Sequence, residues 1–151
     1  MPGLRQVECA NRDPWARKTA GAREAQAPLI AFVDGDCILQ PGWMTALLET
    51  FHFYPEVAVL RGSTPASWWE WRKAGRVRSG AANNVAFRRE AYLDCPFPEG
   101  SGARAVAMQS AALRRAHYVL WAEPAMQVIR DRRGLAQAVR ALADYSTAQT
   151  R

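Results

Sequence analysis

An unbroken apolar run from Leu29 to Val33 is the strongest pattern in the chain, and it is followed at once by Asp34-Gly35-Asp36. A run of this length, rich in branched and aromatic side chains, predicts a strand buried on both faces of a sheet. Open α/β sheets bind their ligands at the carboxyl ends of such strands, so the two aspartates are the first candidates for chemistry. The plain alternative is an acidic turn, because Asp-Gly is a common turn dipeptide.

The residues after the two aspartates predict a helix and a second strand. Pro41 suits the first turn of a helix. The apolar residues that then fall on one helical face are Trp43, Met44, Leu47, Leu48 and Phe51. A second short apolar run covers residues 57–60. The order of strand, acidic turn, helix and strand predicts a βαβ unit.

The rest of the chain shows weaker patterns of the same two kinds. Val85 and Phe87 alternate with other residues and predict a strand, and a helix is expected to start at Arg88. Further helices are predicted over 15–26, 103–116 and 134–145, and further strands over 117–121 and 126–129. We therefore expect one α/β domain over 1–151. It has a polar segment with a helix over 1–27, a core over 28–131 and an amphipathic helix over 132–151.

Composition narrows the class of protein without pointing to a function. The 151 residues suffice for one domain with a core, and 49% hydrophobic with 23% charged residues is usual for a globular chain. The cysteines, Cys9, Cys37 and Cys95, are too scattered for a disulfide framework or a zinc motif, so a cytoplasmic location is expected. The basic helix at the C-terminus is expected to pack over the core, which is the interpretation we prefer. The alternative is peripheral contact with the inner face of a membrane.

Positive charge points to a phosphate-bearing partner. The net charge is +6, and residues 61–90 hold seven basic residues against two acidic ones. Such a surface attracts phosphates on nucleotides, nucleic acids or anionic lipids, although a solvated basic face is the commonest explanation of a charge cluster. No nucleic-acid-binding motif is present, so no nucleic-acid partner is expected.

Three segments together resemble a known family. Ala31-Phe-Val-Asp-Gly-Asp-Cys37 followed by Pro41-Gly-Trp43 resembles the centre of a family 2 glycosyltransferase with the GT-A fold. Residues 80–91 and 118–125 resemble later segments of the same family, in the same order. The resemblance implies a three-layer α/β sandwich with a mostly parallel mixed sheet. It also implies transfer of a sugar from a nucleotide-diphospho-sugar donor to a hydroxyl of a sugar, lipid-linked or polysaccharide acceptor.

The resemblance implies roles for individual residues. Asp34 would face the nucleotide ribose or the water shell of a metal, and Asp36 would hold Mn²⁺ or Mg²⁺, which prefer oxygen ligands. Candidate donor-binding residues are Asp34, Asp36 and Arg88, and candidate acceptor-binding residues are Trp68, Trp69, Asn83 and Asn84. The tryptophans also suit ordinary packing, and Arg88 suits a surface position.

The sequence departs from the family pattern in three places. No strand precedes Pro28, so the fold is expected to be incomplete or to be completed by a partner chain. The acidic pair that supplies the general base falls at Ala105 and Val106, which leaves Glu99 as the substitute candidate. The histidine that serves as a metal ligand is absent, because the matching place lies near Ile129 and Arg130.

Two other functions remain open at this point. A relative without catalytic activity, acting as a binding or interaction module, would explain the lost acidic pair. A phosphatase of the haloacid dehalogenase type also carries Asp-x-Asp after an apolar strand. That chemistry needs a further acidic pair and a lysine, and downstream of Asp36 the aspartates are isolated and Lys73 is the sole lysine, so it ranks below the other two readings.

Overall fold

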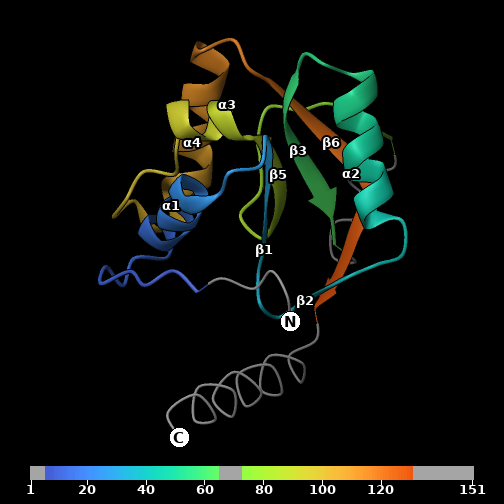
Figure 1. Ribbon diagram of the computed structural model, residues 1–151. Coiled ribbons are helices and arrows are strands. Elements are labelled where there is room, and N and C mark those ends of the chain that lie inside the picture. Colours follow the sequence, from blue (N-terminus) through green and yellow to red (C-terminus); the bar gives the residue numbers. More distant parts are fainter. Residues whose placement is uncertain (1–5, 65–72, 131–151) are drawn as a thin grey trace, which may run out of the picture.

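A mixed β-sheet separates two layers of helices (Figure 1). The computed structural model describes residues 6–64 and 73–130. The predicted C-terminal helix and two acceptor candidates, Trp68 and Trp69, lie outside the described residues. The elements in chain order are α1 (Pro14–Glu24), β1 (Leu29–Val33), β2 (Cys37–Leu39), α2 (Trp43–Phe53), β3 (Val57–Ser63), β4 (Gly75–Arg76), β5 (Asn84–Arg88), α3 (Arg89–Asp94), a 3₁₀ turn (Gly102–Arg104), α4 (Ala105–Arg115) and β6 (Val119–Arg130).

The strands follow the order β1-β5-β3-β6-β2, and β4 pairs with β6. β3 and β6 run parallel, whereas β5 runs antiparallel to both β1 and β3. β1, β3 and β6 therefore point the same way, and β5 is reversed between two of them. The predicted α/β class with a mixed sheet is confirmed, although antiparallel pairings outnumber the parallel one in the described residues. The reason is that β5 is inserted between the two strands of the βαβ unit.

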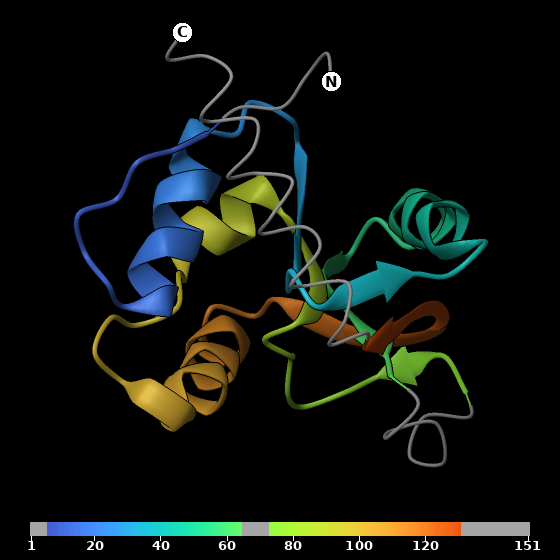
Figure 2. The same cartoon turned by 90° about the horizontal axis from the view of Figure 1, so that it is seen from below.

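The two faces of the sheet bury two separate cores. On β5 the side chains alternate, so Val85 and Phe87 join one core while Ala86 joins the other. The first core includes residues of α1, α3 and α4, and the second is formed against α2 through Trp43 and Leu47. Figure 2 shows α1 and α2 on opposite sides of the sheet. This arrangement is the predicted three-layer sandwich.

The first strand is less buried than its sequence predicts. β1 stands at one end of the strand order, and among its residues Ile30 is buried while Ala31 is exposed. The prediction of a strand buried on both faces is therefore wrong for this edge position. The described residues before β1 form α1 but no strand, so nothing among them pairs with the outer side of β1.

The end of the described chain also differs from the expected elements. The two short strands predicted over 117–121 and 126–129 form one strand, β6, with a register irregularity opposite Gly62 and Ser63. The three residues of β2 were not predicted as a strand. They pair antiparallel with the last part of β6, with Cys37 opposite Arg130. In the part of the chain that is described, no helix has the length and apolar character needed to cross a bilayer.

Candidate active site

Asp34 and Asp36, the carboxylate pair, lie in a tight turn between β1 and β2. The amide of Asp34 donates to the Asn83 carbonyl at 3.3 Å, and the amide of Cys37 donates to the Asp34 carbonyl at 2.9 Å. The turn thus closes with an i to i+3 hydrogen bond, as a β-turn does. It holds both carboxylates at the carboxyl end of β1, where ligands are expected in α/β sheets.

Arg130 contacts both members of the carboxylate pair. Its Nη2 lies 3.9 Å from Asp34 Oδ2, and its Nε lies 3.9 Å from Asp36 Oδ2. The pairing of β2 with β6 explains this position, because it sets the backbone of Arg130 opposite Cys37, the neighbour of Asp36. The two carboxylates therefore converge on one point, and a cationic side chain occupies it.

Lys18 approaches the carboxylate pair from α1. Its Nζ lies 3.2 Å from Asp34 Oδ1, donates to the Ala82 carbonyl at 2.6 Å and sits 5.4 Å from the centre of the Phe32 ring. The helix that carries it is capped by Asp13, which accepts from the amide of Trp15 at 3.1 Å. Three separate contacts hold the ammonium group in place beside Asp34.

Cys37 completes the surroundings of Asp36. Its Sγ donates to Asp36 Oδ1 over 3.6 Å. Burial, followed by the charge of Asp36, raises the pKa of the Cys37 thiol, so the thiol stays protonated near neutral pH. The thiol is therefore a hydrogen-bond donor to the carboxylate pair.

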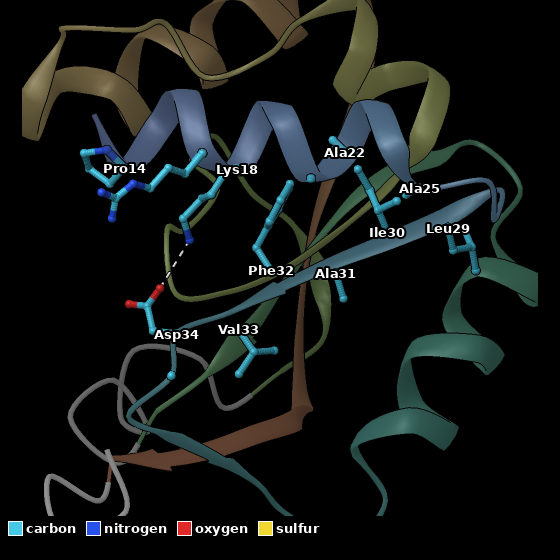
Figure 3. Close-up of a pocket in the computed structure, with 13 residues that line it drawn as sticks. Pro14, Lys18, Ala22, Ala25, Leu29, Ile30, Ala31, Phe32, Val33 and Asp34 are labelled. Carbon is cyan, nitrogen blue, oxygen red and sulfur yellow. Dashed lines mark hydrogen bonds and ion pairs between the residues drawn. The ribbon is translucent and has the colours of Figure 1, made fainter. Parts of the chain in front are cut away.

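A groove of about 820 Å³ runs between α1 and β1 and ends at Asp34 (Figure 3). Phe32, Ile30 and Ala22 supply much of its apolar lining, while Lys18 and Asp34 face each other at one end. The small side chains of α1 leave this space open. It lies along the outer edge of β1, on the side opposite β5.

Asn83 and Asn84 have different surroundings although they are neighbours. The Asn83 carbonyl receives the Asp34 amide, which leaves Asn83 close to the carboxylate pair. Asn84 is fully buried, and its side chain accepts from Trp43 Nε1 at 2.9 Å and donates to the Ser63 and Met126 carbonyls at 3.0 and 2.7 Å. The prediction that Asn84 contacts an acceptor is corrected, because its amide is used inside the core.

Arg88 lies at the wrong end of the sheet for a donor-binding role. It pairs in register with Leu29, at the start of β1, whereas Asp34 follows the last residue of that strand. Its Nε donates to the Val57 carbonyl and its Nη2 to the Phe51 carbonyl, each at 2.9 Å. These bonds satisfy carbonyls at the end of α2 and the start of β3. The proposed phosphate contact of Arg88 is therefore corrected to a structural role.

No carboxylate stands in the place of the expected general base. Ala105 is fully buried at the start of α4, and Val106 follows it. The substitute candidate Glu99 accepts from Asn11 Nδ2 at 3.2 Å, in front of the N-terminus of α1. The structure does not bring Glu99 together with Asp34 and Asp36.

The carboxylate pair has the ligand chemistry of a site for Mn²⁺ or Mg²⁺. Two converging carboxylates suit these ions, which commonly bind one or two carboxylates together with substrate phosphates. Among residues 6–64 and 73–130 no group of three or more His, Cys, Asp or Glu side chains gathers to form a larger ligand set. The carboxylate pair fits a metal that also binds a phosphate ligand. For the metal to bind there, the Arg130 side chain must move away from the two carboxylates.

Lys18 and the contacts of Arg130 were not anticipated from the sequence. Lys18 lies three residues after Trp15 and four before Ala22, so helical spacing places it on the face that turns toward the sheet. That spacing was the available signal. The contact of Arg130 depends on the pairing of β2 with β6, which no local pattern indicates.

The fold of the described residues is an α/β fold of the GT-A type. The chain matches a solved glycosyltransferase, described as the crystal structure of GalNAc-T7 with UDP, GalNAc and Mn²⁺, with a TM-score of 0.62 and 12% sequence identity. The match covers 78% of this chain and 30% of that chain. At this identity the likeness shows a shared fold. A comparison with curated protein sequences finds no match.

The family follows from the sequence match. Residues 7–115 match the family described as Glycosyl transferase family 2. This region includes α1, the carboxylate pair, the buried Asn84 and all of α4. The chain therefore belongs to glycosyl transferase family 2, and the resemblance read from its sequence is confirmed.

Proposed function

We propose that this chain binds a nucleotide-diphospho-sugar at the carboxylate pair and transfers the sugar to a hydroxyl group of an acceptor. The observation that carries the proposal is the convergence of Asp34 and Asp36 on one cation position at the end of β1, in a family 2 glycosyltransferase. The presence of UDP, GalNAc and Mn²⁺ in the structural neighbour supports the same class of ligands. The acceptor would be a sugar, a lipid-linked sugar or a polysaccharide.

Each side chain of the site has a distinct part in this proposal. Asp36 and Asp34 would hold Mn²⁺ or Mg²⁺, which when bound neutralises charge on a diphosphate leaving group. Lys18 fixes the orientation of Asp34 through its contact at 3.2 Å. Asn83, next to the same turn, stays the candidate for an acceptor contact. Trp68 and Trp69, outside the described residues, stay predictions for the same role.

Calorimetry with a panel of nucleotide-sugars and Mn²⁺ tests the proposal. The wild type is expected to bind at least one donor, and Asp36→Ala is expected to abolish the metal-dependent part of the binding. Glu56→Ala removes an exposed carboxylate in front of β3 and serves as the matched control, with unchanged affinity expected. A folded wild type that binds no donor would contradict the proposal.

One observation favours a second function, in which the chain binds a ligand or partner without transferring a sugar. The position of the general base is held by Ala105 and Val106, and Glu99 lies elsewhere. Val106→Asp introduces an acid at the half-buried member of this pair. A gain in transfer would identify an enzyme that lacks its base. Retained donor binding without any gain would favour the binding module.

No strand in the part of the chain that the structure describes pairs with the outer edge of β1, which supports the prediction that another strand completes the sheet. The amide of Asp34 and the carbonyl of Pro28 form hydrogen bonds on the side of β1 that faces β5. The backbone N–H and C=O groups of Leu29, Ala31 and Val33 therefore point away from β5. A partner chain is one source of such a strand. A cytoplasmic location with peripheral membrane contact, and the absence of a nucleic-acid partner, stay predictions.

A further inference from the structure

All four oxygens of the carboxylate pair are engaged by side chains of this chain. Lys18 contacts Asp34 Oδ1 at 3.2 Å, Arg130 contacts Asp34 Oδ2 and Asp36 Oδ2 at 3.9 Å each, and Cys37 donates to Asp36 Oδ1 over 3.6 Å. Two negative and two positive side chains together make the site formally neutral. A divalent cation entering this site would add two charges with no carboxylate left to balance them.

The side chains of Lys18 and Arg130 are held at the site by different numbers of contacts. Lys18 has further contacts with the Ala82 carbonyl at 2.6 Å and with the Phe32 ring, and its side chain is 18% exposed. The Arg130 side chain is 55% exposed, and both of its ion pairs are long, at 3.9 Å. Exposed ion pairs of this kind contribute little to stability. Arg130 is therefore the cation that can leave.

We propose that Arg130 is the resident cation of the carboxylate pair and that it competes with a divalent metal for this position. A metal in contact with both carboxylates would stand where the guanidinium lies, and the positive charges would repel each other. Metal binding then requires the Arg130 side chain to turn out toward solvent while its backbone stays paired with Cys37. As a result, the protein alone binds divalent metal weakly.

A nucleotide diphosphate changes this competition, and this step rests on the proposed function. The displaced guanidinium would find a new anionic partner, because arginine binds phosphate groups in a bidentate manner. The metal and the nucleotide are then expected to strengthen each other's binding. The two ligands are linked through Arg130 rather than through the carboxylates alone.

Calorimetric titration of the full chain with Mn²⁺ alone, at low ionic strength, tests the competition. Arg130→Met keeps an apolar stem and removes the charge, and it is expected to bind Mn²⁺ on the order of tenfold more tightly than the wild type. Arg130→Lys keeps the charge and is expected to bind as weakly as the wild type. Arg115→Met, the same change at an exposed arginine at the end of α4, is expected to have no effect.

The outcomes separate this proposal from the proposed function. Equal Mn²⁺ affinity of Arg130→Met and the wild type, including the absence of binding in both, would overturn the competition. Tighter binding by Arg130→Lys would overturn it as well, because charge would not be the cause. Circular dichroism checks the fold of each variant, and Arg130→Gln replaces Arg130→Met if the latter does not fold. Titration with UDP in the absence of metal tests nucleotide binding separately.

Discussion

Asn84 shows how a polar residue in a strand can be part of the core. Its side chain links α2, β3 and β6 through Trp43, Ser63 and Met126. Gly62 lies against the same amide, and a Cβ at that position would collide with Asn84 Nδ2 and with the Met126 carbonyl. A buried amide with every partner in place fixes the relative positions of these elements.

Asn84→Ala is expected to lower the free energy of unfolding by roughly 2–4 kcal/mol, because it leaves the Trp43 N–H and two carbonyls buried without partners. Urea denaturation measures the loss. Asn83→Ala, one residue earlier and only half-buried, is the matched control and should change stability little. Similar losses in the two variants would contradict a core role for the Asn84 side chain.

The sequence identified the two carboxylates of the site but not the contacts that Lys18 and Arg130 make with them. Asp34 and Asp36 stand out because they directly follow a long apolar run. Arg130 is almost a hundred residues away in sequence, and its contact arises from the register of β2 on β6. Arg88 and Asn84 were misread for a related reason. Residue type suggested phosphate and sugar contacts, whereas the positions on β5 direct both side chains to structural bonds.

At the scale of elements, β1 has two unlike edges. Residues 28, 30, 32 and 34 form the hydrogen-bonded pairs with β5, as the bonds of Pro28 and Asp34 show. The alternate residues direct their N–H and C=O groups away from β5, toward the open groove of about 820 Å³. The two sets should differ in solvent exchange although they share one strand.

Amide hydrogen exchange measured by NMR tests this alternation. The amides of Ile30 and Phe32 are expected to exchange slowly, and those of Leu29, Ala31 and Val33 quickly, because only the first set is bonded to β5. β5 is the internal control, since residues 85–87 pair with strands on both sides and their amides should be protected. Equal protection along β1 would mean that another strand covers its outer edge.

The long helices and the strand that became β5 were predictable, whereas the short strand β2 and the position of β5 in the sheet were not. α2 and α4 have a clear helical period and formed close to the expected bounds. β2 has three residues, too few for a pattern, and forms because β6 extends far enough to pair with it. The place of β5 between β1 and β3 is a tertiary choice, and it made β1 an edge strand rather than a central one.

At the scale of the whole molecule, several acidic groups are held in their protonated forms. Burial is the main cause that raises the pKa of Tyr92, Cys37 and Cys95, with the neighbouring aspartates adding to the effect on the cysteines. Tyr92 is fully buried and shares a hydrogen bond of 3.1 Å with Thr19, which joins α3 to α1. Ionisation of these groups is therefore easier in the unfolded chain than in the fold.

Stability is expected to fall on the alkaline side. A folded-state pKa above the unfolded value means that the unfolded state loses protons first, so the contribution is intact below the reference values of 9.0 for cysteine and 10.0 for tyrosine and is lost as pH rises above them. Urea midpoints at pH 7, 9 and 10.5 measure the decline. Tyr92→Phe removes one ionisable group and should give a shallower decline. An unchanged slope would contradict a role for Tyr92.

The three-layer α/β architecture is the part of the whole molecule that the sequence predicts best. The pattern of strands and helices predicts the α/β class, the family resemblance implies the three layers, and the two cores on opposite faces of the sheet agree with both. The direction and order of the strands were harder to predict from the sequence, because they depend on pairing between segments that are far apart in the chain. The family match and the fold of the structural neighbour agree with this architecture.

The outward edge of β1 also bears on how this protein behaves at high concentration. An unpaired strand edge is a template on which further chains can add, which leads to self-association and aggregation. The strand is short, with Pro28 before it and the charged Asp34 after it, and both are features that interrupt such growth. The same aspartate that serves the candidate site therefore also acts as a gatekeeper for solubility, and changes that remove its charge act on both properties at once.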